Sequence, residues 1–407
     1  MSPRTADYKK SPPEPTPEPS PPARSLLSDR RVQLTALLTL CIAVVMAAGF
    51  VDVDLLALAT NANYFSTLPA TSAAEPAISL LNFDPAFQTD VLGRNATARK
   101  IADLEWQAFH EAGIYYEPDN SLYITSNYVS LQDNINITVL SLDDYSITST
   151  QFPDLWEANG GSSYYPPGSD TAKRPPQHVY CDEGDFEHPS ALIAVDPGTN
   201  TSTTLLTSFL GRNFSSVNDV RQHAETGDLW FTDADYGYFQ DFRPAPVIPK
   251  QVYRFEPSTG VIQVVADGFV QSNGLEFSPD HKTLYVSDTG AQQFTKNDTG
   301  PGTIYAFDVI AGKRLANRRT FAFCDNGFPD GVHADTDGNV WAGCGDGVHV
   351  FNPDGVLLGK IYVGETSNNF AFIPGGVLVF SNYRLWLVEN IKAQGREVCK
   401  DFGVGCA

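Results

Sequence analysis

The chain has 407 residues, of which 42% are hydrophobic and 12% aromatic, and its formal net charge is −21. This length is enough for one large domain or two ordinary ones with a sizeable core. The negative charge argues against a nucleic-acid partner, because phosphates are bound mainly by Lys and Arg.

The first 51 residues predict a tail and a membrane segment. Residues 1–31 are rich in Pro and polar side chains, which predicts a disordered tail. Residues 32–51 contain no charge and are long enough to cross ~30 Å of hydrocarbon as a helix. Because Arg30 and Arg31 precede this segment and Asp52 and Asp54 follow it, we expect the N-terminus in the cytoplasm.

Two fates of this segment stay open. It is either a signal anchor, which gives a single-pass type II membrane protein with a luminal or extracellular domain, or a signal that is cleaved. The small residues of Ala57-Leu58-Ala59 offer a cleavage site near Ala59, which would release a secreted protein. In both cases the body of the chain enters the secretory pathway.

Sequons and cysteines fit this route. Five Asn-x-Ser/Thr acceptor sites for glycosylation follow the apolar segment and none precedes it: Asn95, Asn136, Asn200, Asn213 and Asn297. Five cysteines lie beyond the segment: Cys181, Cys324, Cys344, Cys399 and Cys406. This odd number predicts one or two disulfides and a buried free thiol.

Residues 52–90 have few strand signals and are interpreted as a linker and adapter, whereas residues 91–407 contain a repeat. A turn and a short strand recur at Gly227-Asp-Leu-Trp-Phe-Thr-Asp and Lys282-Thr-Leu-Tyr-Val-Ser-Asp, among five copies. A second strand element recurs six times, marked by Leu140, Val195, Phe255, Phe307, Phe351 and Val388. The sixth copy of the first element is expected near Gln177 to Cys181. These spacings suit four-stranded blades and predict an all-β fold, a six-bladed β-propeller, whereas a β-sandwich would not repeat a pair of strands.

Four oxygen-bearing side chains precede these strands at matching distances. Glu111, Asn218 and Asn273 each lie 11 residues before Leu122, Leu229 and Leu284, and Asp330 lies 10 residues before Val340. Equivalent points on four blades would face one axis. Two carboxylates and two amide oxygens are hard donors, suited to a calcium-like ion. Singly, each residue would be ordinary turn chemistry.

At these motifs the sequence resembles the gluconolactonase family that includes senescence marker protein (regucalcin), and in particular its fungal lactonohydrolase-like branch. The residues concerned are His110-Glu111, Asn218-Asp219, Asn273-Gly274-Leu-Glu-Phe-Ser-Pro-Asp and Pro329-Asp330-Gly331-Val. The resemblance implies a six-bladed propeller with one divalent metal on its axis. Glu111, Asn273 and Asp330 would be metal ligands, and Asn218 a fourth ligand or a substrate contact. The chain departs from the family at Ala112-Gly113 and Ser272, where Gly-Pro and Pro are common.

These observations lead to the hypothesis of a metal-dependent lactonase that opens an aldonolactone or related sugar lactone with an activated water. Asp330 and Asn218 are the candidate catalytic residues; Asn218, His110 and His333 are candidate substrate contacts. Ca²⁺ is the expected ion, with Zn²⁺ or Mn²⁺ as alternatives, and we expect a monomer. The rivals are a paraoxonase-like or strictosidine-synthase-like propeller enzyme, which would use a histidine, and a non-catalytic extracellular metal-binding propeller.

Overall fold

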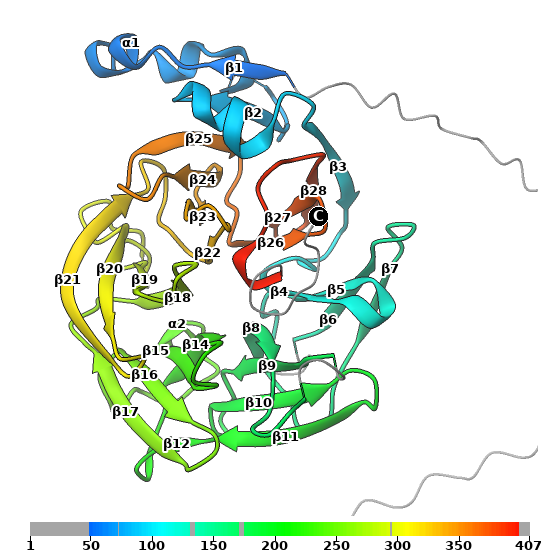
Figure 1. Cartoon of the computed structure of the whole chain (residues 1–407), viewed down its shortest axis with the longest axis vertical. Helices are drawn as coiled ribbons and strands as arrows, with labels where there is room; N and C mark the ends of the chain where they lie inside the picture. The colour runs from blue at the N-terminus through cyan, green and yellow to red at the C-terminus, as the bar shows by residue number, and fades with distance from the viewer. Residues whose placement is uncertain (1–48, 72, 131–134, 171–174, 294, 399–407) are drawn as a thin grey trace, which may run out of the picture. The chain divides into compact units, whose positions relative to one another are not determined.

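A computed structural model describes residues 49–71, 73–130, 135–170, 175–293 and 295–398. Six antiparallel sheets, each built on four strands, stand around a common axis (Figure 1). The predicted six-bladed propeller is therefore confirmed. The expected strand near Gln177 is also present, as β9 of the second blade.

The first three blades take their strands in chain order from the axis outward, except that the second begins with its inner strand β8. Their strands are β4 (Glu111–Tyr116), β5 (Ser121–Thr125), β6 (Ile137–Ser141) and β7 (Ile147–Thr150) in blade one; β8 (Ala158–Tyr164), β9 (Gln177–Asp182), β10 (Ala191–Asp196) and β11 (Thr201–Leu206) in blade two; and β14 (Ser216–Gln222), β15 (Leu229–Ala234), β16 (Gln251–Glu256) and β17 (Val261–Ala266) in blade three. A small hairpin, β12 (Ser208–Phe209) and β13 (Arg212–Asn213), links blades two and three.

The last three blades continue the pattern. Their strands are β18 (Ser272–Phe277), β19 (Thr283–Asp288), β20 (Thr303–Ile310) and β21 (Arg314–Phe323) in blade four; β22 (Val332–Ala334), β23 (Val340–Cys344), β24 (Gly347–Phe351) and β25 (Leu357–Tyr362) in blade five; and β26 (Asn369–Ile373), β27 (Gly376–Ser381) and β28 (Arg384–Glu389) in blade six. The few helical pieces are α1 (Leu55–Thr60), α2 (Tyr236–Phe239), the 3-10 turns Phe65–Thr67, Pro69–Thr71 and Glu117–Asp119, and the π-helical turn Phe87–Leu92.

Blade six is completed by the beginning of the propeller chain. Its outer strand is β3 (Thr97–Asp103), which pairs antiparallel with β28 over the full length of that strand. Residues nearly three hundred positions apart in sequence thus share one sheet, and the ring closes without a free seam. The closure brings the start of β4, and with it Glu111, beside blade six.

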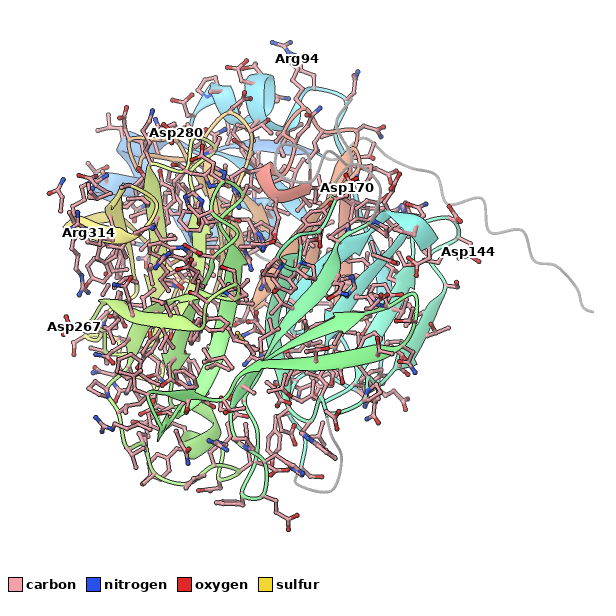
Figure 2. All side chains as sticks on the ribbon, turned by 60° about the horizontal axis from the view of Figure 1, so that its bottom comes forward. Arg94, Asp144, Asp170, Asp267, Asp280 and Arg314 are labelled. Carbon is pink, nitrogen blue, oxygen red and sulfur yellow. A yellow bond between two sulfur atoms is a disulfide. The ribbon has the colours of Figure 1, made fainter. Side chains whose placement is uncertain are left out.

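The strands within each blade are buried on both sides by the neighbouring blades. In β15, Leu229 and Phe231 pack in the apolar core on one side, whereas Trp230 between them packs in the core on the other side. Successive side chains of a strand point to opposite faces, so both faces of this strand require apolar residues. This explains why the repeated elements read as short apolar runs. Charged residues such as Asp144, Asp267 and Asp280 lie on the periphery (Figure 2).

The N-terminal part of the described chain extends blade five. Strands β1 (Phe50–Asp52) and β2 (Ser79–Asn82) pair in parallel, and β2 pairs with β25, so this sheet has six strands. The predicted membrane segment 32–51 lies outside the described residues except for its end, where Phe50 and Val51 are strand and not helix. The prediction is therefore wrong at this boundary. Among the described residues, no helix has the length and apolar character needed to span a bilayer.

The predicted mixture of disulfide and free thiol is found. Cys324 and Cys344 form a disulfide in blade five, and Cys181 is a buried free thiol. Cys399 and Cys406 lie outside the described residues.

The extension of blade five encloses a lysine. Lys360 on β25 is fully buried, because β2 covers the strand edge that would otherwise face water. Its ammonium lies 2.7 Å from Asp325 Oδ1 and 3.1 Å from Asp346 Oδ2, with the ring of Phe65 at 5.0 Å. The charge is thus paired on one side and packed against an aromatic ring on the other.

We expect Lys360→Met to lower the free energy of unfolding by about 3 kcal/mol, because it leaves two carboxylates at a buried site without their cation. Chemical denaturation would measure the change. Lys313→Met, at an exposed turn, is the control and should change stability by no more than about 0.5 kcal/mol. Equal effects of the two substitutions would contradict this account of blade five.

Candidate active site and metal centre

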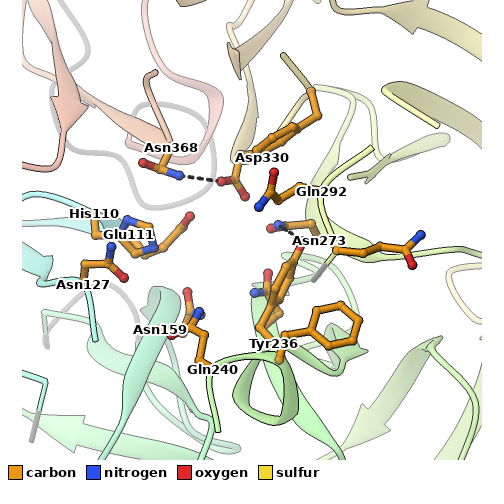
Figure 3. A pocket seen from close by; sticks show the side chains of 14 residues that line it. His110, Glu111, Asn127, Asn159, Tyr236, Gln240, Asn273, Gln292, Asp330 and Asn368 are labelled. Atoms are coloured by element: carbon orange, nitrogen blue, oxygen red, sulfur yellow. Dashed lines mark hydrogen bonds between the residues drawn. The ribbon is translucent and has the colours of Figure 1, made fainter. Parts of the chain in front are cut away.

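A cavity of about 310 Å³ opens at one end of the propeller axis (Figure 3). Its wall is rich in amide side chains and holds two carboxylates, one imidazole and three aromatic rings. The lining residues are His110, Glu111, Asn127, Asn159, Asn218, Tyr236, Phe239, Gln240, Asn273, Gln292, Gln293, Phe328, Asp330 and Asn368.

The structure brings the four predicted ligand residues together in this cavity. Glu111 begins β4, Asn218 lies in β14, Asn273 lies in β18, and Asp330 stands two residues before β22. All four are buried in their surroundings, with between 3% and 6% of their surface exposed. The inner strands of four blades therefore present two carboxylates and two amides to one small space.

A bulge in the inner strand explains the regular spacing that the sequence shows. The pairing register shifts between Val217 and Val220 around Asn218, and between Ser272 and Leu275 around Asn273. In β4 the shift follows Glu111 directly, where Ala112 has a φ of 59°. A bulge re-aims a side chain out of the regular alternation, here toward the axis. The same backbone irregularity recurs in different blades and places each ligand at a similar distance before the next strand.

Glycine permits the close approach of neighbouring inner strands. A Cβ atom at Gly274, next to Asn273, would lie 2.3 Å from the carbonyl oxygen of Asp330. A Cβ atom at Gly331 would lie 2.2 Å from Oδ1 of Asn369. Neither position has room for a side chain, so these glycines follow from the packing of the ligands around the axis.

Hydrogen bonds occupy one side of the ligand set and leave oxygen atoms open on the other. Oε2 of Glu111 accepts from Nδ2 of Asn369 at 2.7 Å, and Oδ2 of Asp330 accepts from Nδ2 of Asn368 at 2.9 Å. Nδ2 of Asn273 donates to the hydroxyl of Tyr236 at 3.0 Å. In contrast, Oδ1 of Asn218 and Oδ1 of Asp330 are buried and have no hydrogen-bond partner in the described part of the chain.

Unpartnered buried oxygens are costly unless a ligand completes them. The open atoms here belong to one carboxylate and one amide, which are ligand types that hard cations prefer. The residues therefore fit a divalent cation held by Glu111, Asn218, Asn273 and Asp330.

The electrostatics of the pocket also favour a cation. Burial raises the pKa of Glu111 well above its ordinary value, and the negative charges of Asp330 and Asp219 raise it further. Burial likewise raises the pKa of Asp330 to about 7, although the hydrogen bond from Asn368 acts in the opposite direction. Two buried carboxylates that resist ionising together would be stabilised in their charged forms by a positive ion between them.

The two histidines that the sequence singled out have different positions. His110 lines the cavity, and burial lowers the pKa of its imidazole to about 4, so the ring is neutral near pH 7. His333 is buried and lies outside the set of lining residues, with its Nε2 3.0 Å from Oδ1 of Asn369. A direct substrate contact by His333 does not fit this position, because Asn369 stands between it and Glu111.

Sequence reasoning missed two cavity residues on the remaining blades. Asn159 lies in the bulge of β8, and its Oδ1 is buried without a partner among the described residues. The following strand begins 18 residues later, at Gln177, because blade two has a longer connection. Asn368 precedes Val377 of blade six by only nine residues. The search at 10 or 11 residues therefore failed, although Asn159-Gly160 repeats the Asn273-Gly274 pair.

Comparisons with known proteins agree with this architecture. Residues 178–377 match the model of the SMP-30/Gluconolactonase/LRE-like region. Lactonohydrolase oryL of Aspergillus oryzae is 30% identical over 315 residues, which cover 69% of this chain and 67% of that protein.

Solved structures give the same result. The gluconolactonase XC5397 of Xanthomonas campestris superimposes with a TM-score of 0.62 at 26% identity, covering 79% of this chain and 98% of that one. The calcium-binding protein regucalcin of Agrobacterium tumefaciens shares the fold, with a TM-score of 0.52 at 17% identity over 73% of this chain and 95% of that one. With this axial site on six blades, the chain belongs to the SMP-30/gluconolactonase/LRE-like family.

Proposed function

We propose that this protein is a lactonase that uses one divalent cation to open a lactone ring by hydrolysis. The observation that carries the proposal is the convergence of Glu111, Asp330 and two amides at the floor of a polar cavity, with buried oxygens left open. The lactonohydrolase and gluconolactonase relatives support the reaction class.

Ca²⁺ is the cation that this ligand set favours, because all four side chains offer oxygen and none offers nitrogen or sulfur. The calcium-binding relative agrees with this choice, and Zn²⁺ and Mn²⁺ are the alternatives. A bound divalent cation would polarise the lactone carbonyl and lower the pKa of a coordinated water.

Asp330 is placed to take the proton of the attacking water. Its Oδ2 is held by Asn368, whereas its Oδ1 is open and able to accept a proton. The water oxygen forms a bond to the carbonyl carbon, the ring C–O bond breaks, and the proton taken by Asp330 returns to the leaving oxygen. Asn218, with its open amide oxygen, would hold the substrate or the cation in register with this group.

The cavity wall indicates a neutral, hydroxylated substrate. Among its described lining residues are eight amide side chains and no Lys or Arg. Amides donate and accept hydrogen bonds and so suit hydroxyl groups, whereas a phosphate or carboxylate on the substrate would face Glu111 and Asp330 without a cationic side chain. These features support an aldonolactone or a related sugar lactone.

A second candidate reaction rests on His110. Its Nδ1 is bonded to Oδ1 of Asn382 at 2.8 Å, and its neutral ring borders the cavity. In a paraoxonase-like or strictosidine-synthase-like enzyme this imidazole, and not Asp330, would be the base. A non-catalytic propeller that only binds metal is the third alternative.

We expect Asp330→Asn to lower kcat for hydrolysis of a neutral aldonolactone by about 100-fold or more, because the amide cannot accept the proton of water. Chelation of divalent metal should abolish turnover, and added Ca²⁺ should restore it. A pH-stat assay with the neutral lactone and its phosphorylated analogue would measure both, and the phosphorylated analogue should be the poorer substrate.

Asp337→Asn, on an exposed turn of the same blade, is the matched control and should retain full activity. A loss of turnover in His110→Ala with activity retained in Asp330→Asn would favour the histidine-based reaction. Metal binding without hydrolysis of any lactone would leave only the binding module.

The pH dependence of stability offers a further test of the paired carboxylates. An Asp in the unfolded chain has its ordinary pKa of 3.8, whereas Asp330 in the metal-free fold has a pKa of about 7. Between these values the folded protein binds a proton that the unfolded chain has lost, so this group destabilises the fold as pH rises. Ca²⁺ must displace that proton at pH 5 but not at pH 8.

We therefore expect a given Ca²⁺ concentration to raise the Tm more at pH 8 than at pH 5, as measured by differential scanning fluorimetry. In Asp330→Asn this pH dependence of the calcium effect should largely disappear. An equal Tm shift at both pH values in the unmodified protein would show that the carboxylates do not carry the proposed charge pairing.

We also infer a luminal or extracellular location for the propeller. Asn95, Asn200, Asn213 and Asn297 are exposed and Asn136 is partly exposed, so glycans could be attached without disturbing the core. The Cys324–Cys344 disulfide fits an oxidising compartment. Treatment of the native protein with an N-glycosidase should increase its electrophoretic mobility; unchanged mobility would contradict this location.

A further inference from the structure

Blade six supplies none of the four candidate ligands, yet it touches both carboxylates. Asn369 is the first residue of β26, and Asn368 precedes it. Side chains of consecutive residues in extended backbone point to opposite sides. Accordingly, Nδ2 of Asn368 donates to Asp330 (Figure 3), and Nδ2 of Asn369 donates to Glu111.

The Asn369 contact has a defined direction. Nη2 of Arg221 lies 3.4 Å from Nδ1 of His333, and because a guanidinium can only donate, that nitrogen is the acceptor. Nε2 of His333 then carries the hydrogen and donates to Oδ1 of Asn369 at 3.0 Å. The backbone N–H of Phe370 donates to the same oxygen at 2.8 Å. The amide of Asn369 is therefore fixed with its nitrogen toward Glu111.

The Asn368 contact is supported in a similar way. Nδ2 of Asn382 donates to Oδ1 of Asn368 at 3.1 Å, and Nδ1 of His110 donates to Oδ1 of Asn382 at 2.8 Å. This orientation turns Nδ2 of Asn368 toward Asp330. Each carboxylate is thus held by an asparagine amide whose orientation depends on a histidine further out.

We propose that Asn368 and Asn369 are positioning residues that hold Asp330 and Glu111 at a fixed separation, and that His110 and His333 orient these two amides. Each contact occupies one oxygen of a carboxylate and leaves the other available to the cavity, as Oδ1 of Asp330 shows. Hydrogen bonds behind metal ligands fix ligand orientation and contribute to metal affinity. This inference rests on the divalent cation site of the proposed function.

The test measures the affinity of the full chain for Ca²⁺ alone by isothermal titration calorimetry. Asn368→Leu and Asn369→Leu should each weaken binding by about 10- to 100-fold. Asn82→Leu is the matched control, since Asn82 is also buried and donates to a carboxylate, that of Asp52, at the outer edge of blade five. It should lose stability but keep the affinity of the unmodified protein.

Substitution of His333 supplies the second measurement if a buried leucine prevents folding. Gln can donate from a position close to that of Nε2, whereas Leu cannot, so His333→Gln should retain more Ca²⁺ affinity than His333→Leu. Equal affinities of these two variants, or unchanged affinity in Asn368→Leu and Asn369→Leu, would overturn the positioning role. If Glu111→Gln still abolished binding in that case, the proposed cation site would stand. Failure of the unmodified protein to bind any divalent cation would overturn both.

Discussion

The site depends on the placement of two carboxylates, Glu111 and Asp330, in the buried centre of a ring of strands. Like charges in a poorly solvated space oppose each other, and burial alone raises the pKa of both groups. The protein meets this constraint with amides and not with a cationic side chain in the cavity wall: Asn368 and Asn369 donate to the carboxylates, and Asn218 leaves an amide oxygen open. A divalent cation is the component that would balance the arrangement.

Ring closure is what makes the arrangement specific. Glu111 belongs to the first blade and Asn369 to the last, and their contact spans 258 residues of sequence. It forms only when β3 has paired with β28 and the start of blade one has been brought beside blade six. Folding of the propeller and assembly of the site are therefore one event, and substitutions that weaken the closure would also be expected to disturb the ligands.

The repeated strands, the count of blades and four converging residues could be predicted from the sequence, because each blade repeats a turn, an apolar strand and a polar end. The offset of the ligands is a local property of the bulged inner strand, so it is visible without the fold. Asn159 escaped because a longer connection in blade two breaks the offset, and the asparagine pair of blade six escaped because its strands are closer together. The role of His333 could not be read from sequence, since it depends on contacts with Arg221 and Asn369 across three blades.

The most direct test is a comparison of metal occupancy with hydrolysis in one sample. Metal-free protein would be titrated with Ca²⁺ while bound calcium and the initial rate of lactone opening are recorded together. The account predicts that both rise along one curve and saturate at one ion per chain. Full hydrolytic activity in the metal-free protein, or a rate unrelated to occupancy, would contradict it.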